Sequence, residues 1–287
     1  MSPPLSPLYS DPSGGVRLYR GDCFDLLPRL PEHGAIDLIF ADPPYFLSGD
    51  GITCRSGRMA PVSKGDWDRP GPVGDMHALN LAWVTLCRDA LSADGSMWVS
   101  GTRHVIFSVG FAMQQIGMKL LNDVCWEKPN PPPNLSCRYF THSAELLLWA
   151  ARGPKSRHVF NYHAMREEAG GRQMKSVWRI LAPRREEKAL GRHPTQKPLA
   201  LLSRIISACT RPGDLVVDPF AGSGTTGVAA AALARRFIGI ERDAGFAALA
   251  ARRLAAARDG AQAARPGAAA PRRQRAVRRT LREGGTP

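Results

Sequence analysis

Short apolar runs alternate with longer amphipathic stretches along most of this chain. Runs of four to six apolar or alternating residues, bounded by turn-forming residues, predict seven strands. They lie near residues 16–20, 36–40, 96–100, 122–127, 145–150, 215–218 and 237–241.

Amphipathic segments supply the helices between these strands. Residues 76–91 repeat apolar side chains at helical spacing, at Leu79, Trp83, Leu86 and Ala90. Further helices are expected around Leu26 and at 104–116, 199–209, 224–235 and 243–258. Strands that alternate with helices in this way predict an α/β protein with a doubly wound, mostly parallel sheet.

Several segments fall outside this pattern. Residues 1–15 are rich in Pro, Ser and Gly, and we expect them to be flexible. Residues 46–75 are punctuated by glycine, which predicts an irregular loop, and residues 151–192 lose their apolar periodicity. From 259 to 287 the chain consists mainly of Ala, Pro, Gly and Arg, a composition that cannot build a core, so it is expected to be a disordered tail.

The charge of the chain points to a polyanionic partner. Its 287 residues carry a formal net charge of +14, and 44% of them are hydrophobic, which is enough for a sizeable core. Residues 261–287 hold seven arginines against one acid, so the tail explains only part of the excess. The loop 46–75, with Trp67 among its basic residues, is the expected contact with nucleic acid.

The cysteines and the N-terminal sequence bear on the compartment. Six cysteines are scattered, with no C-x-x-C pair and no histidine at zinc-binding spacing, so we expect reduced thiols and no bound metal. The first residues lack the basic and apolar regions of a leader peptide, and no stretch approaches the ~20 apolar residues of a membrane-spanning helix. These features favour a soluble cytoplasmic protein.

The first of two chemical motifs is Asp42-Pro43-Pro44-Tyr45. It directly follows the apolar run 36–40, and its two prolines end the strand because they remove backbone donors. Taken alone, the motif is also compatible with an ordinary turn that carries a solvated Asp.

The second motif, at residues 215–227, is a strand that leads into a glycine turn and then a helix. Gly222, Gly224 and Gly227 fit the G-x-G-x-x-G pattern of dinucleotide sites, so a nicotinamide cofactor has to be considered. The glycines alone do not distinguish between cofactors.

Together the two motifs resemble those of S-adenosylmethionine-dependent DNA amino-methyltransferases. Their order, catalytic motif first and cofactor motif last, is similar to that of the β class, whose chain is circularly permuted. The hexapeptide at 193–198 also resembles this family, and longer strings at 40–48, 64–68 and 133–143 resemble the DpnA-type adenine methyltransferases of GATC restriction–modification systems, which can act on single-stranded DNA. The resemblance implies a seven-stranded, Rossmann-like methyltransferase domain over residues 16–258 that methylates the N6 amine of adenine.

This amine is a weak nucleophile because its lone pair is delocalised into the ring, so a catalyst must hold it through its hydrogens. Asp42 and the carbonyl of Pro43 are the expected acceptors, and Pro44 adds rigidity. Tyr45 offers an aromatic face to a base that leaves the duplex. The resemblance implies that S-adenosylmethionine is bound by Asp22, Cys23, Lys197, Asp218, Phe220, Gly222, Gly224, Thr225, Thr226 and Glu241. Among these, Glu241 is expected at the ribose hydroxyls and Asp22 near the cofactor adenine.

The same resemblance assigns sequence recognition to residues 151–192, although a solvated insertion is the alternative. Arg is the commonest reader of guanine, and seven arginines occur in this segment. They are Arg152, Arg157, Arg166, Arg172, Arg179, Arg184 and Arg185. Double-stranded DNA is the expected partner, with single-stranded DNA and a second copy of the chain in a homodimer as further candidates.

Three other functions stay open on the sequence. Cytosine-N4 methylation would use the same motif of residues 42–45, although Asp at the first position of this motif favours adenine. A nicotinamide-dependent oxidoreductase would use the glycine turn but leaves Asp42 to Tyr45 unexplained. A basic DNA-binding protein without catalysis would be expected to show decay in one of the motifs, and both are intact.

Overall fold

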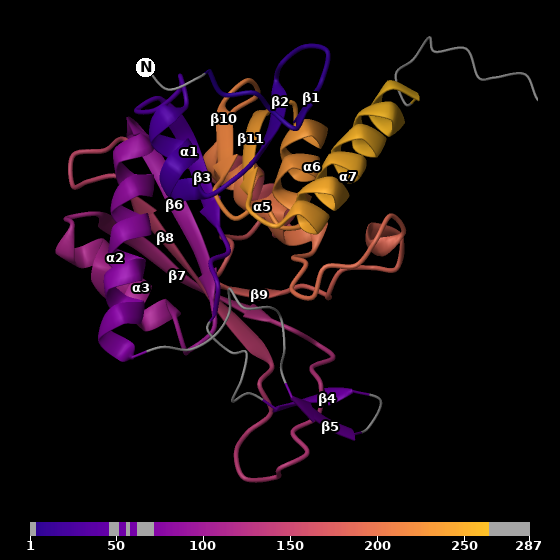
Figure 1. Ribbon diagram of the computed structural model, residues 1–287. Helices are drawn as coiled ribbons and strands as arrows, with labels where there is room; N and C mark the ends of the chain where they lie inside the picture. Colours follow the sequence, from indigo (N-terminus) through magenta and orange to yellow (C-terminus); the bar gives the residue numbers. More distant parts are fainter. Residues whose placement is uncertain (1–3, 46–51, 56–57, 62–71, 264–287) are drawn as a thin grey trace, which may run out of the picture.

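The computed structural model describes residues 4–45, 52–55, 58–61 and 72–263, and nine strands of this part form one sheet (Figure 1). Their order is β1-β2-β11-β10-β3-β6-β8-β7-β9. Their bounds are β1 Tyr9–Ser10, β2 Val16–Arg20, β3 Ile36–Ala41, β6 Leu91–Gly101, β7 Lys119–Glu127, β8 Ala144–Ala151, β9 Val177–Arg179, β10 Leu215–Asp218 and β11 Arg236–Glu241. The seven predicted strands are therefore confirmed, and β1 and β9 are additions at the two ends of the sheet.

The central strands run parallel. β2, β11, β10, β3 and β6 pair in parallel, β8 runs antiparallel between β6 and β7, and β9 is parallel to β7. The strands β2, β3, β6, β7, β10 and β11 consequently end at the same edge of the sheet, which we call the carboxyl edge. β3 and β10 are neighbours there, so the segments that follow them meet although they are far apart in sequence.

Helices cover both faces of the sheet, as the doubly wound prediction requires (Figure 1). Helices α1, α2 and α3 lie on one face, and α5, α6 and α7 lie on the other. The helix bounds are α1 Cys23–Leu26, η1 Leu27–Arg29, α2 Val73–Ala90, α3 Ile106–Gln115, α4 Tyr162–Glu168, η3 Glu186–Lys188, α5 Leu199–Cys209, α6 Thr225–Ala232 and α7 Ala244–Ala263. Among the described helices, none is both long and apolar enough to cross a membrane.

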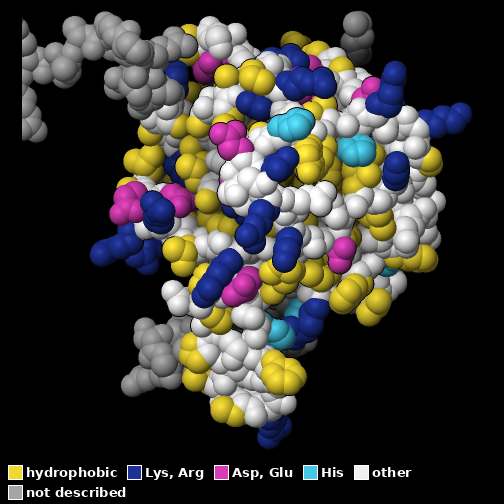
Figure 2. All heavy atoms as spheres, turned by 180° about the vertical axis from the view of Figure 1, so that it is seen from behind, with side chains coloured by type: hydrophobic (Ala, Val, Ile, Leu, Met, Phe, Trp, Pro, Cys, Tyr) yellow, Lys and Arg dark blue, Asp and Glu magenta, His cyan; other side chains and the backbone are white. Residues whose placement is uncertain are grey.

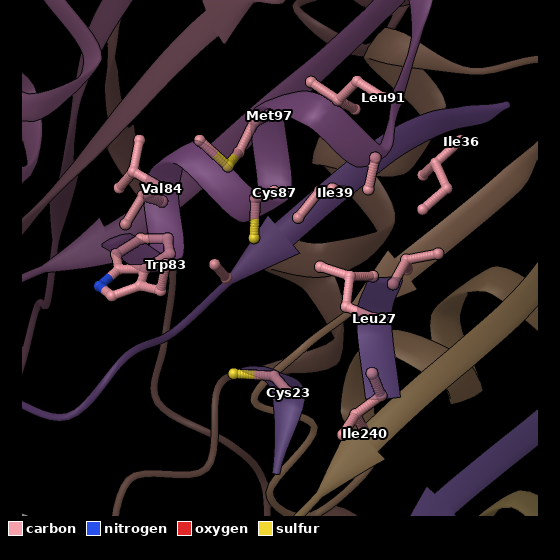
Figure 3. Close-up of a cluster of buried hydrophobic side chains, with 14 of the residues drawn as sticks. Cys23, Leu27, Ile36, Ile39, Trp83, Val84, Cys87, Leu91, Met97 and Ile240 are labelled. Carbon is pink, nitrogen blue, oxygen red and sulfur yellow. The ribbon is translucent and has the colours of Figure 1, made fainter. Parts of the chain in front are cut away.

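Strand β3 has an apolar core on each side. Ile39 belongs to the cluster that includes Trp83 of α2 (Figure 3), whereas Leu38 and Phe40 belong to the cluster that includes Leu202 of α5. Successive side chains of a strand point to opposite faces, so a strand covered on both faces is apolar throughout rather than alternating. The continuous run that was predicted as a buried strand thus fixes the position of the residues that follow it.

Three segments depart from the sequence prediction. Tyr9–Ser10, within the segment expected to be flexible, pairs antiparallel with β2, so this part of residues 1–15 is ordered. The loop expected at 46–75 contains a hairpin of β4 Ile52–Arg55 and β5 Arg58–Pro61, while most of its remainder lies outside the described residues. Helix α7 runs to Ala263 because its Ala-rich sequence favours helix, and the rest of the predicted tail, 264–287, also lies outside the described residues.

Candidate active site

The Asp-Pro-Pro-Tyr motif forms a hook at the carboxyl edge, directly after β3. The hydroxyl of Tyr45 donates a hydrogen bond to Asp42 Oδ1 at 2.5 Å and lies 3.2 Å from Ser100 Oγ at the end of β6. Tyr45 is only 4% exposed. The hook is therefore folded back on itself and held against the neighbouring strand, which contradicts the alternative of a turn with a solvated Asp.

Lys197 completes the hook from the other half of the chain. Its ammonium group donates to Asp42 Oδ2 at 2.8 Å and to the Tyr45 hydroxyl at 2.8 Å. It also lies 3.4 Å from Glu145 Oε2, and Glu145 in turn bonds the ammonium group of Lys128. Two acids and two bases thus form one buried, charge-balanced cluster. Lys197 was predicted as a cofactor-binding residue; in the structure it lines the pocket and its ammonium group pairs with Asp42.

The pKa values in this cluster follow from the pairing. Burial raises the pKa of Asp42, and the Lys197 charge opposes that rise. Burial alone would lower the pKa of Lys197, but the carboxylates of Asp42 and Glu145 raise it well above its ordinary value. Burial would likewise raise the pKa of Glu145, yet the two ammonium groups lower it to about 2. At neutral pH Lys197 is therefore a fixed cation and Glu145 a fixed anion.

The glycine turn between β10 and α6 is held by a hydrogen bond to the carboxylate of Glu241. Gly222 has a φ of +51° and Gly224 a φ of +74°, a left-handed conformation that favours glycine. The N–H of Gly222 donates to Glu241 Oε2 at 2.7 Å, and the N–H of Asp243 donates to Glu241 Oε1 at 2.8 Å. A Cβ at Gly224 would lie 3.0 Å from the Cβ of Ala250 on α7, so this glycine allows close helix packing.

Asp218, at the end of β10, is a buried acid, and its hydrogen-bond donors among the described residues are neutral. It is 2% exposed and accepts from the Thr226 hydroxyl at 2.5 Å and from the Phe220 N–H at 3.0 Å. Burial raises the pKa of its carboxyl to about 7, and the nearby acids Asp42 and Glu241 add to the rise.

One pocket at the carboxyl edge joins the hook to the glycine turn. It is lined by Asp22, Cys23, Asp42, Pro43, Pro44, Tyr45, Lys197, Asp218, Phe220, Gly222, Thr225, Thr226 and Glu241. Among the predicted site residues, only Gly224 is not part of the lining. The structure therefore brings together residues that the sequence separates by up to about two hundred positions.

Sequence analysis missed several residues of this pocket. Trp83 and Asn80 reach it from α2, and the Trp83 N–H donates to the Asn80 side chain at 3.0 Å. The Trp83 and Phe220 rings are nearly perpendicular, with centroids 5.5 Å apart. His193 and Phe246 also line it, and their rings meet in a T-shaped arrangement with centroids 4.2 Å apart. Trp83 was predicted only as part of the apolar face of a helix, and helical spacing alone does not show that the face borders a pocket.

The segment predicted to read the target sequence, 151–192, lies at both edges of the sheet. The backbone N–H groups of Arg152 and Arg157 donate to residues 95 and 94, near the start of β6, at 3.1 Å and 2.7 Å. These arginines therefore lie at the edge opposite the pocket. Arg179 ends β9, which is parallel to β7, so the residues from Arg179 onward follow the carboxyl edge.

Known proteins similar to this chain were found at the level of family, sequence and fold. The family model described as DNA methylase matches residues 36–252. The type II methyltransferase M2.DpnII of Streptococcus pneumoniae is 49% identical over 241 residues, which cover 83% of this chain and 89% of that protein. The type II methyltransferase M2.MboI of Moraxella bovis is 45% identical over 249 residues, which cover 87% of this chain and 91% of that protein.

Solved structures give the same picture of the fold. The crystal structure of an M1.HpyAVI–SAM complex matches with a TM-score of 0.59 and 28% identity, covering 83% of this chain and 98% of that one. The cytosine-N4-specific PvuII DNA methyltransferase matches with a TM-score of 0.69 and 21% identity, covering 87% of this chain and 89% of that one. At that identity the second match supports the fold alone.

Proposed function

The chain belongs to the DNA methylase family, and from this membership we propose that it transfers a methyl group from S-adenosylmethionine to the N6 amine of adenine at specific DNA sites. The similarity to type II methyltransferases places it in a restriction–modification system. Its proposed substrate is double-stranded DNA in the cytoplasm, with single-stranded DNA as a second substrate. We propose a homodimer as its assembly.

The observation that carries this proposal is the position of the hook relative to the glycine turn within one pocket. Asp42 lines the pocket at the end of a strand that is buried on both faces, and hydrogen bonds from Lys197 and Tyr45 hold its carboxylate. An amine held through its hydrogens by this carboxylate and the Pro43 carbonyl becomes more tetrahedral, which frees its lone pair. The contribution of these residues is positioning and electrostatics.

The residues of the glycine turn fit S-adenosylmethionine, which supplies an electrophilic methyl group when bound. The desolvated Asp218 suits the positively charged end of this cofactor, because a cation would offset the burial of its charge. Glu241 suits the ribose hydroxyls, and Asp22 at the N-cap of α1 suits the adenine side. Trp83 and Phe220 add aromatic surface to the same pocket.

Cytosine-N4 methylation is the second candidate, since both targets are exocyclic amines and one hook can serve either. The Asp at position 42 favours adenine. A nicotinamide-dependent oxidoreductase does not account for the buried cluster of Asp42, Tyr45, Glu145 and Lys197, which has no role in hydride transfer.

The deciding experiment incubates the full chain with labelled S-adenosylmethionine and plasmid DNA and identifies the modified nucleoside by mass spectrometry. N6-methyladenine is expected, and mapping its positions gives the target sequence, with GATC as the first site to inspect. N4-methylcytosine would replace the adenine assignment by the second candidate, and an unmodified plasmid would contradict both.

A further inference from the structure

Residues 128–143, which connect β7 to β8, form an arm whose base belongs to the active-site cluster. The N–H of Lys128 donates to the carbonyl of Ser143 at 2.7 Å and closes the base of the arm. The Lys128 ammonium group bonds Glu145, which lies 3.4 Å from the Lys197 ammonium group. Since Lys197 holds Asp42, the arm is joined to the hook through a short chain of charged contacts.

The arm projects away from the body of the molecule, next to the β4–β5 hairpin (Figure 1). Seen from behind in Figure 2, the projecting lower end carries hydrophobic side chains. Three hydrophobic residues of the arm, Leu135, Tyr139 and Phe140, are 40%, 58% and 95% exposed. Phe140 thus presents almost its whole ring to solvent.

Contacts inside the arm hold the neighbours of this ring. The Asn134 side chain donates to the Tyr139 carbonyl at 2.5 Å and accepts from the Ser136 N–H at 3.1 Å. The Tyr139 ring lies tilted against His142 with centroids 5.4 Å apart, and Arg103, two residues after β6, donates to His142. Tyr139 and His142 are therefore engaged with each other, while Phe140 is left for an external partner.

The charge of the arm indicates which partner that is. Its sequence contains Lys128, Arg138 and His142 and no acidic residue, and Arg103 packs beside it. An exposed aromatic ring on an arm whose charged residues are all basic fits the stacked bases and phosphates of DNA. A surface that binds another protein would not require residues 128–143 to lack acidic side chains.

An enzyme that acts on a base inside a duplex must extrude it, which leaves a gap in the stack. Building on the proposed function, we propose that Phe140 enters this gap and stacks on the base pairs on either side of it, as apolar wedges do at kinked steps. Arg138 and Arg103 hold the adjacent phosphates. The arm then lowers the cost of extrusion, whereas the hook receives the extruded adenine.

The test compares Phe140→Ala with the unaltered protein on one target site in three forms. These are a paired duplex, the single strand alone, and a duplex in which the target adenine faces an abasic position. Methylation of the paired duplex is expected to slow by about tenfold or more, and the other two rates to stay within about twofold, because neither requires a paired base to be opened. In a second readout, 2-aminopurine at the target position is expected to brighten less with Phe140→Ala than with the unaltered protein.

The matched control is Phe107→Ala on α3, since Phe107 is 69% exposed but lies outside the arm. It is expected to leave all three rates unchanged. Equal slowing of methylation by Phe140→Ala on all three DNA forms, or no slowing on the paired duplex, would contradict the proposal that Phe140 acts as a wedge. A loss of dimer in light scattering with Phe140→Ala and unchanged duplex rates would instead assign the ring to an interface between copies. Failure of the unaltered protein on every form would contradict the proposed function itself.

Discussion

At the scale of single residues, Asp42 is the group that the chemistry depends on, and its surroundings allow a clean test. Asp42→Ala removes the acceptor for the target amine, so methyl transfer is expected to be abolished. Lys197 keeps Glu145 as a counter-ion 3.4 Å away, so the fold should tolerate the change. Affinity for S-adenosylmethionine, measured by calorimetry, is expected to stay within about tenfold. Retained transfer would refute the assignment.

Asp218 is the residue through which pH should act on cofactor binding. Its carboxyl has a pKa of about 7 in the folded protein against an ordinary 3.8, so the folded state binds a proton that the unfolded state releases. This contribution to stability is therefore complete below about pH 4 and is lost as pH rises through about 7. A cationic ligand prefers the ionised carboxylate. Cofactor binding is accordingly expected to weaken about tenfold for each pH unit below about 7.

Calorimetric titrations across this range, made in buffers of different ionisation enthalpy, measure both the affinity and the proton released. Asp218→Asn provides the control, because its side chain has the same shape and no proton to lose. Its affinity should be lower and independent of pH. A sloping profile in Asp218→Asn equal to that of the unaltered protein would place the titrating group elsewhere.

The sequence identified both motifs because each is a short run of neighbours with a recognisable pattern. It could not show that Lys197 binds Asp42, since 155 positions separate them and only the sheet order brings them together. It could not separate the role of Gly224 in packing against α7 from that of Gly222 either. That distinction depends on which atoms a Cβ would meet, and a sequence holds no such information.

At the scale of elements, strand direction decides which arginines can reach the target. Arg152 and Arg157 follow β8 at the edge opposite the pocket, and the eight residues of that strand span about 25 Å. Arg179 ends β9 at the carboxyl edge, and Arg184 and Arg185 come after it. We therefore restrict the prediction that residues 151–192 recognise the target sequence to the residues from Arg179 onward.

Single Arg→Ala variants are expected to fall into two groups, according to whether they change the site preference. Losing a bidentate base contact at Arg179, Arg184 or Arg185 should cost about 1–3 kcal/mol at one base position only. Arg152→Ala and Arg157→Ala serve as controls and should leave the site preference unchanged. The measurement is methylation over a set of sites that differ at one position. Relaxed specificity in the controls, or uniform slowing in the other three, would put recognition in a different element.

Elements with strong local patterns were predicted well, and helix α5 matches its predicted bounds, 199–209. β9 was missed because three residues give too little pattern, and it exists through its pairing with β7. The antiparallel direction of β8 was also beyond the sequence, since its apolar run fits either direction. That direction places Arg152 and Arg179 at opposite edges of the sheet, a separation that depends on topology and that residue chemistry alone could not predict.

At the scale of the whole molecule, the question is how a chain of net charge +14 divides its attraction for DNA between its folded part and its tail. Residues 264–287 lie outside the described residues, and their composition predicts that they do not build a core. They hold the seven arginines of the tail. Arginines on such a segment act through release of counter-ions from phosphates, and each contact contributes about 0.9 to the slope of log K against log salt.

Deleting residues 264–287 is therefore expected to weaken DNA binding at low salt and to reduce this slope, by up to about six if every arginine meets a phosphate. Turnover at saturating DNA should persist, because the hook, the glycine turn and helix α7 up to Ala263 remain. Fluorescence anisotropy at several salt concentrations measures the slope, and a chain with the seven arginines changed to Gln separates charge from length. An unchanged slope in both chains would mean that the folded part alone, with the arm and the carboxyl edge, provides the contacts to the phosphates.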